Sequence, residues 1–145
     1  MPHTLKPNSR KIWSAVFLYG YIALVMFLCL IRIEGPENLI IPTILHIPID
    51  KWVHFFMLIP FPVFIFLFRK WHGFEIDKGR FFFQILCLGA LLGLLIEVLQ
   101  GSVTTYRGED PYDLLADSIG TLAGLFLVLA FGTTIEKWIG KLLKI

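Results

Sequence analysis

Glu97 and Gln100 lie in the segment LLGLLIEVLQGS, Leu91 to Ser102, whose other side chains are mostly apolar. They are three residues apart, so on a helix they share one face. Ionisable residues inside apolar spans are costly to bury, and they usually face other polar groups and serve a function. A buried carboxyl group can hold or transfer a proton under the control of its neighbours. The first question is therefore which groups face Glu97.

Two other segments bring ionisable side chains to the edges of apolar runs. They are PIDKWVHFF, residues 48–56, and YRGEDPYDLLADSIG, residues 106–120. His54 and Asp117 each lie about one turn inside an apolar run, so we take Glu97, His54 and Asp117 as the candidate catalytic acid–base groups. Arg107 and Lys51 are cations that could bind a phosphate or a carboxylate. The candidate substrate-binding residues are Arg107, Lys51, Asp50, Gln100, Asp110 and Asp113.

Helix capping is the competing explanation for some of these acids. Asp50 follows Pro48 and precedes an apolar run, which is typical of an N-cap. The sequence DPYD places Asp110 at an N-cap, Pro111 at the first helical position and Asp113 in the first turn. No cap is needed at Glu97, His54 or Asp117. For these three, a functional site and a purely structural network of buried ion pairs both remain open.

The composition identifies the kind of protein that positions these residues. Of the 145 residues, 57% are hydrophobic and 17% are charged, and 14 are Phe. A soluble protein of this size cannot bury that many apolar side chains. Apolar runs at residues 12–31, 52–68, 81–99 and 114–131 predict four membrane spans. We therefore expect an all-α integral membrane bundle that forms a single domain over residues 1–145.

Lysine and arginine residues are distributed unevenly between the two ends of the predicted spans. Ten of the 13 lie in the N-terminal tail, in the loop between the second and third spans, and in the C-terminal tail. Since cytoplasmic segments are enriched in these residues, we expect both termini to be cytoplasmic in a bacterial inner membrane. The C-terminal TTIEKWIGKLLKI repeats apolar residues at helical spacing, which predicts a short amphipathic helix at the membrane interface.

This topology brings the three polar segments together on the outer side of the membrane. The second span begins there, the third ends there and the fourth begins there. Six acids and two bases give a net charge of −4 at that end if all are ionised (6 acids minus 2 bases): Asp50, Glu97, Glu109, Asp110, Asp113 and Asp117 against Lys51 and Arg107. We expect a cation or a shared proton to offset this excess, with Glu97 facing Lys51, His54, Arg107 or Asp117.

Small residues and prolines indicate how the spans pack. Gly89 and Gly93 in the third span, and Gly120 and Gly124 in the fourth, are each four residues apart. Such pairs let helix backbones approach closely, so we expect these two spans to be in contact. Pro60 and Pro62 predict a kink in the second span, because each removes a backbone hydrogen-bond donor. Cys29 and Cys87 lie in apolar runs and are expected to be packing residues.

Taken in order, DKWVHFF, EVLQ and R-x-x-D-x-x-D-x-x-x-D-x-x-G-x-x-x-G resemble the VanZ-like family. The last pattern is formed by Arg107, Asp110, Asp113, Asp117, Gly120 and Gly124. The resemblance covers about residues 50–124 and implies a small multi-pass membrane protein of the bacterial cell envelope. The namesake of the family is associated with reduced susceptibility to the glycopeptide antibiotic teicoplanin. Asp117 departs from the family pattern, in which Asn is usual, and adds an acid to the cluster.

Three functions remain open at this point, and whether the chain is an enzyme is undecided. In the first, the site handles an envelope lipid or a polyprenyl-linked cell-wall precursor, with His54 or Glu97 as the acid–base group. In the second, the carboxylates and His54 support proton- or ion-coupled binding or transport. In the third, the chain is an accessory structural protein whose ionic cluster only fixes helix packing.

Ligands and partners follow from the same cluster. A divalent cation is a conceivable cofactor, because carboxylates could bind it and bridge it to a phosphate. The spacing matches no established metal motif, so the metal ligands stay unknown. Expected partners are membrane lipids, with an anionic lipid or a polyprenyl-linked precursor as the ligand, and a homo-oligomer is compatible with the sequence. We expect no nucleic-acid partner.

Overall fold

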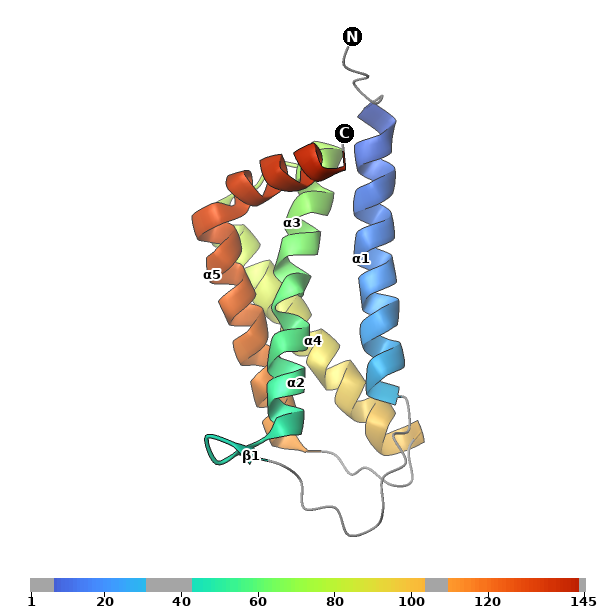
Figure 1. The fold of residues 1–145 in the computed structure, drawn as a ribbon, viewed down its shortest axis with the longest axis vertical. Coiled ribbons are helices and arrows are strands. Elements are labelled where there is room, and N and C mark those ends of the chain that lie inside the picture. Colours follow the sequence, from blue (N-terminus) through green and yellow to red (C-terminus); the bar gives the residue numbers. More distant parts are fainter. Residues whose placement is uncertain (1–6, 31–42, 104–109, 144–145) are drawn as a thin grey trace.

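Nearly all of the described chain is helical. The computed structural model describes residues 7–30, 43–103 and 110–143 (Figure 1). The helices are α1 (Pro7–Leu30), α2 (Ile49–Leu58), α3 (Pro60–His72), α4 (Lys78–Val103) and α5 (Pro111–Leu142). Two short strands, β1 (Thr43–Ile44) and β2 (Ile47–Pro48), pair as an antiparallel hairpin before α2.

The predicted bundle of four apolar spans is confirmed. Within the described residues, four helical segments are long and apolar enough to cross a membrane: Ser9–Leu30, Ile49–His72, Lys78–Ser102 and Pro111–Leu142. Each of these four segments begins about three residues before the apolar run from which it was predicted. The reason is that the first helical turn accommodates polar residues, whose side chains can bind its free backbone N–H groups.

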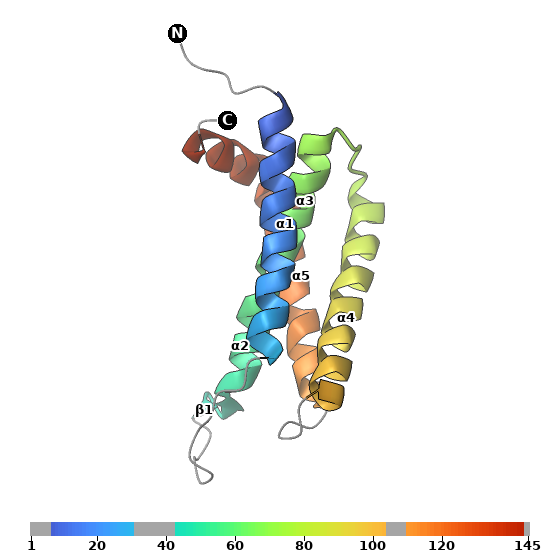
Figure 2. The same ribbon diagram turned by 90° about the vertical axis from the view of Figure 1, so that its right-hand side faces the viewer.

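Helix α5 is the centre of the bundle. It packs against α2, α3 and α4, whereas α1 packs mainly against α3 and, more loosely, α4. The first turn of α1 and the last turns of α5 lie at one end, as predicted, and the hairpin lies at the other (Figures 1 and 2). The starts of α2 and α5 and the end of α4 therefore share the end opposite the termini.

The predicted C-terminal amphipathic helix is continuous with α5. Its last turns bend away from the bundle axis and run across the end of the bundle (Figure 1). Trp138 and Leu142 are exposed on this segment, while Ile139 packs against the core. Trp71 of α3 donates a hydrogen bond to Glu136 over 3.3 Å, which ties the segment to the bundle. An exposed Trp and Leu on a lysine-bearing helix suit a membrane interface.

Two prolines interrupt the second span, as predicted. Regular helical hydrogen bonding stops at Ile59, although its backbone angles, φ −57° and ψ −43°, remain helical. Pro60 and Pro62 lack the N–H groups that would bond the carbonyls of Phe56 and Leu58. The kink therefore leaves backbone oxygens of α2 open to neighbouring helices.

Tyr21 of α1 donates its hydroxyl hydrogen to the carbonyl of Met57 beside this kink. We expect Tyr21→Phe to lower the free energy of unfolding by about 1–2 kcal/mol, because a shielded carbonyl loses its donor. Unfolding of the purified protein in detergent, followed by circular dichroism, measures the change. Tyr19→Phe is the matched control, since Tyr19 lies exposed on the same helix. Equal losses in both variants would contradict a specific role for the Tyr21 hydroxyl.

Glycines bring α5 close to two helices. A Cβ atom on Gly89 of α4 would lie 2.4 Å from Cγ2 of Thr121, so the predicted contact between the third and fourth spans is confirmed. Gly120 and Gly124 do not serve that contact, which corrects the sequence interpretation. They face the kinked second span, and a Cβ atom on Gly120 would lie 2.2 Å from the carbonyl oxygen of Phe55. Only a residue without a side chain fits against a backbone at this distance.

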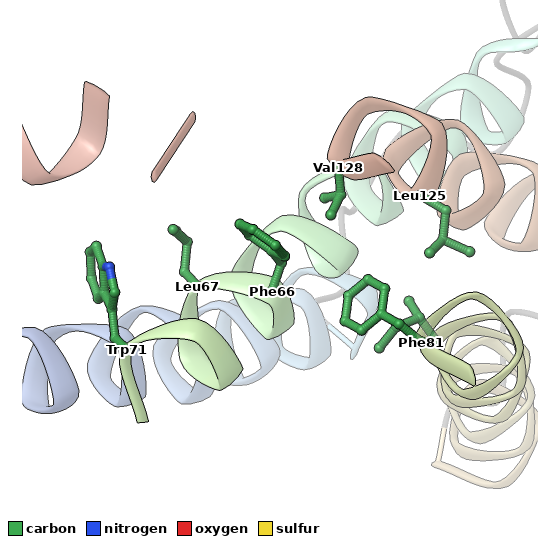
Figure 3. Packing of buried hydrophobic residues seen from close by; sticks show 7 residues of the cluster. Phe66, Leu67, Trp71, Phe81, Leu125 and Val128 are labelled. Atoms are coloured by element: carbon green, nitrogen blue, oxygen red, sulfur yellow. The ribbon is translucent and has the colours of Figure 1, made fainter. Parts of the chain in front are cut away.

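The apolar core is divided between two clusters. One joins α3, α4 and α5 near the end that carries the termini, and Figure 3 shows most of its side chains: Phe66, Leu67, Trp71, Phe81, Leu125 and Val128. The other lies between the four helices α1, α2, α3 and α4 and consists of Val25, Cys29, Leu58, Phe61, Leu92 and Ile96. Most of the buried polar side chains lie together at the opposite end, around the starts of α2 and α5 and the end of α4.

Candidate functional site

Lys51, in the first turn of α2, gathers three carboxylates around its ammonium group. Its Nζ atom lies 2.9 Å from Asp50, 2.5 Å from Asp110 and 2.6 Å from Asp113. Asp110 and Asp113 stand at the start of α5, so these contacts join two helices. A lysine ammonium carries three N–H donors, and in this arrangement all three point to carboxylates.

His54 lies one turn further into α2, between two acids of α5. Its Nδ1 is 3.1 Å from Asp117 Oδ1, and its Nε2 is 3.8 Å from Asp113 Oδ2. The two acids are four residues apart, so they lie one above the other on the helix and bracket the ring. His54 is 3% exposed, Asp113 1% and Asp117 0%. The group can hold a proton between an imidazole and two carboxylates, away from bulk water.

Glu97 faces inward, as expected, but its hydrogen-bond donor is different from those predicted. The residue is 6% exposed, whereas its neighbours Leu95 and Val98 are each 48% exposed. Its two carboxylate oxygens accept hydrogen bonds from the backbone N–H of Asp110, at 3.2 and 3.1 Å. A carboxylate at a helix N-terminus also interacts favourably with the helix dipole. Glu97 thus fastens α4 to the start of α5.

The capping predictions have opposite outcomes. Asp110 is the N-cap of α5, since its Oδ1 accepts from the backbone N–H of Tyr112 at 2.9 Å and Pro111 follows it. The expectation that Asp50 caps the second span is wrong. That helix begins at Ile49 with Pro48 at its N-cap, so Asp50 lies inside the first turn and its carboxylate binds Lys51.

Gln100 and Arg107 complete the predicted set. Gln100 is buried and donates to the carbonyl of Cys29 over 2.9 Å. This bond joins the end of α4 to the end of α1. The side-chain Nε2 of Gln100 therefore faces α1 and not the acids of α5. Arg107 lies outside the described residues, as does Glu109.

The acid excess predicted for this end is present in the described cluster. It contains five carboxylates, Asp50, Glu97, Asp110, Asp113 and Asp117, against the single lysine Lys51. With all five ionised and His54 neutral, the net charge is −4 (1 minus 5). Oxygen atoms of Asp50, Asp110 and Asp113 lie within 4.8 Å of one another, which is close enough to share a metal ion. The Lys51 ammonium lies between these oxygens, so a metal ion would have to displace it.

An apolar groove opens beside the cluster, between the starts of α2 and α5. Its volume is about 410 Å³, within the range of small-molecule pockets. Trp52 and Phe55 line one side, Leu115 and Ile119 line the other, and Lys51 lies at its edge. The groove was not predicted. The signal was present in these apolar pairs at spacings of three and four residues, but such spacing more often marks a packed core face.

Comparison with known proteins gives a family and no individual relative. The family model described as VanZ/LLP1 matches residues 5–132, which is most of the chain. No curated protein and no solved structure matches the chain. The match includes all three polar segments, the first three apolar helices and α5 as far as residue 132, so the resemblance drawn from the motifs is confirmed. The chain belongs to the VanZ/LLP1 family of membrane proteins.

Proposed function

We propose that the cluster is a membrane-embedded acid–base site for an envelope lipid or a lipid-linked cell-wall precursor. The observation that carries this proposal is the buried imidazole of His54, placed between Asp113 and Asp117. His54 is the group that accepts or donates the proton, because imidazole exchanges protons near neutral pH. The two carboxylates orient the ring through their contacts with its two nitrogen atoms. The polar headgroup binds at the cluster, and an apolar chain of the ligand occupies the adjoining groove.

The arrangement of charge defines which headgroup fits. Lys51 uses its three donors on carboxylates and holds the start of α5 against α2, so we assign it a positioning role. The carboxylate excess favours a headgroup that donates hydrogen bonds, such as a hydroxyl or an ammonium group. At the outer face of the bacterial inner membrane, such a site meets lipid-linked precursors of the cell wall. This placement would connect the protein to teicoplanin susceptibility.

Proton-coupled transport has less support from the geometry. A relay needs polar groups that continue across the membrane. In the described part of α5, the next buried polar residue after Asp117 is Thr121, whose hydroxyl donates to the carbonyl of Asp117. Beyond Thr121, the buried residues of this helix are glycines, Leu125 and Val128. The buried polar residues of α5 are therefore confined to the end of the bundle that carries the cluster.

His54→Gln tests the proposal, because glutamine keeps a hydrogen-bonding group and cannot exchange a proton near neutral pH. We expect an expressed, folded protein whose free energy of unfolding changes by about 1 kcal/mol or less. Its effect on teicoplanin susceptibility, measured in a bacterial host that produces the chain, should be lost. His72→Gln is the matched control, since His72 lies at the other end of the second span. A variant that loses stability and phenotype in proportion would favour a purely structural cluster.

The lipid part of the proposal has a separate test. Leu115→Trp should fill the groove without touching the acids, and the lipid retained by the purified protein in native mass spectrometry should then be lost. Leu127→Trp adds the same bulk to an exposed position of α5 outside the groove. Equal retention by wild type and both variants would show that the groove does not hold the ligand.

A further inference from the structure

Two adjoining cavities lie between the end of α3 and α4. Figure 1 shows the end of α3 beside the last turns of α5, at the end of the bundle opposite the hairpin. The first is polar, has a volume of about 780 Å³ and lies between the end of α3 and the start of α4, with Arg69, Lys70 and Arg80 in its wall. The second has a volume of about 560 Å³ and runs along the sides of α3 and α4 among apolar side chains such as Ile65. Arg69 and Gln84 line both cavities, so the polar space continues into the apolar one.

Arg69 is fixed at the boundary between the two cavities. Its Nη1 donates to Gln84 Oε1 over 2.9 Å, and its guanidinium carbon lies 5.8 Å from the ring centre of Phe81. Phe81 is part of the apolar core cluster of α3, α4 and α5, which gives the guanidinium a rigid surface (Figure 3). A guanidinium carries five N–H donors in a planar fork that matches phosphate oxygens.

Within the described part of the chain, the cations of the polar cavity make no ion pair with a carboxylate. Across residues 7–30, 43–103 and 110–143, no ion pair involves Arg69, Lys70 or Arg80. Two acids also line the cavity, and one of them, Asp77, accepts from the backbone N–H of Arg80 as a cap of α4. The cavity thus has a positive excess, in contrast to the carboxylate cluster at the opposite end.

We propose that these cavities together bind one anionic phospholipid from the leaflet on the side of the termini. The phosphate lies in the polar cavity between Arg69 and Arg80, and one acyl chain lies in the apolar cavity between α3 and α4. Cations that make no ion pair among the described residues, beside an apolar groove, match this ligand in charge and in polarity. This site is independent of the outer cluster and of the function proposed for it.

Native mass spectrometry of the full-length protein in detergent tests the headgroup preference. Wild type should retain phosphatidylglycerol in preference to phosphatidylcholine. Arg80→Gln leaves the contact of Arg69 with Gln84 intact and should weaken phosphatidylglycerol binding about fivefold, and the Arg69→Gln/Arg80→Gln pair should weaken it about 25-fold. Lys137→Gln and Lys141→Gln are controls, because they remove exposed cations on the last turns of α5 outside both cavities. Equal retention of the two lipids, or equal losses in the controls, would overturn the proposal.

Cys87 provides a second measurement inside the apolar cavity. It is exposed and lines that cavity, whereas Cys29 is buried. Phosphatidylglycerol should slow the reaction of Cys87 with N-ethylmaleimide, and phosphatidylcholine at the same concentration should not. Inorganic phosphate should leave the rate unchanged, because it has no chain to cover the thiol. Cys87→Ser should remove the fast-reacting thiol altogether. A rate that responds to phosphate alone, or to neither lipid, would rule out an acyl chain in this cavity.

Discussion

Gly120→Ala is expected to lower the free energy of unfolding by about 1–3 kcal/mol, the range found for overpacked contacts. The new methyl group would lie 2.2 Å from the carbonyl oxygen of Phe55, and that oxygen belongs to the backbone and cannot rotate away. Helices α2 and α5 must therefore separate locally. Unfolding in detergent, compared with wild type, measures the loss.

Gly20→Ala is the matched control for this substitution. A Cβ atom on Gly20 of α1 would meet nothing within 4 Å, so the same change should leave stability unchanged or raise it by about 0.5–1 kcal/mol. Separation of α2 from α5 should also pull His54 away from Asp117, so any lipid binding or phenotype of the outer cluster should fall in Gly120→Ala. Equal stability of the two alanine variants would contradict the close packing of α2 on α5.

Lys51→Met is expected to have the largest effect of any single change in the polar cluster. It removes the ammonium group and leaves three carboxylates with oxygens within 4.8 Å of one another. Loss of one partner from a buried ion pair typically lowers stability by about 3–5 kcal/mol. The loss here should be smaller, because the side chains of Asp50 and Asp110 are partly exposed and solvent screens their charges. The unfolding temperature in detergent, measured with a metal chelator present, gives the loss.

Calcium or magnesium should restore much of that stability in Lys51→Met, because the freed oxygens then offer a ligand set for a divalent cation. Wild type should respond little, since its ammonium group lies between the same oxygens. Lys70→Met is the control, as Lys70 is exposed and makes no ion pair among the described residues. A Lys51→Met protein as stable as wild type in chelator would show that the ammonium does not hold the acids together.

The fold could be predicted from the sequence because each span has its own signal. The lengths of the apolar runs predicted four membrane helices, and the two prolines predicted the kink in the second span. The DPYD pattern predicted that α5 starts at Pro111. The number and order of spans also placed Lys51, Glu97 and Asp117 at one end of the bundle. These inferences depend on periodicity and topology, which are properties of single segments or of their order along the chain.

Contacts between particular atoms could not be predicted in the same way. The carboxylate of Glu97 accepts hydrogen bonds from the backbone N–H of Asp110. Almost every residue type has a backbone N–H, so the sequence does not reveal which residue is the donor. Gly120 faces the backbone carbonyl of Phe55 in α2 and not α4, and a small-residue pattern does not reveal which neighbouring helix a glycine faces. Gln100 shares a helix with Glu97 but turns toward α1. In each case the rotation of one helix against two neighbours decides the partner.

The order of α2 and α5 along the chain has a consequence for biogenesis. Asp113 and Asp117 lie on a span that leaves the ribosome after the span that carries their partners Lys51 and His54. An isolated helix that carries two acids enters a bilayer poorly. Until α5 is inserted, Lys51 and His54 of the second span therefore lack their partners from α5, and Lys51 has only Asp50 of its own helix. We expect a chain that lacks α2 to retain α5 poorly in the membrane.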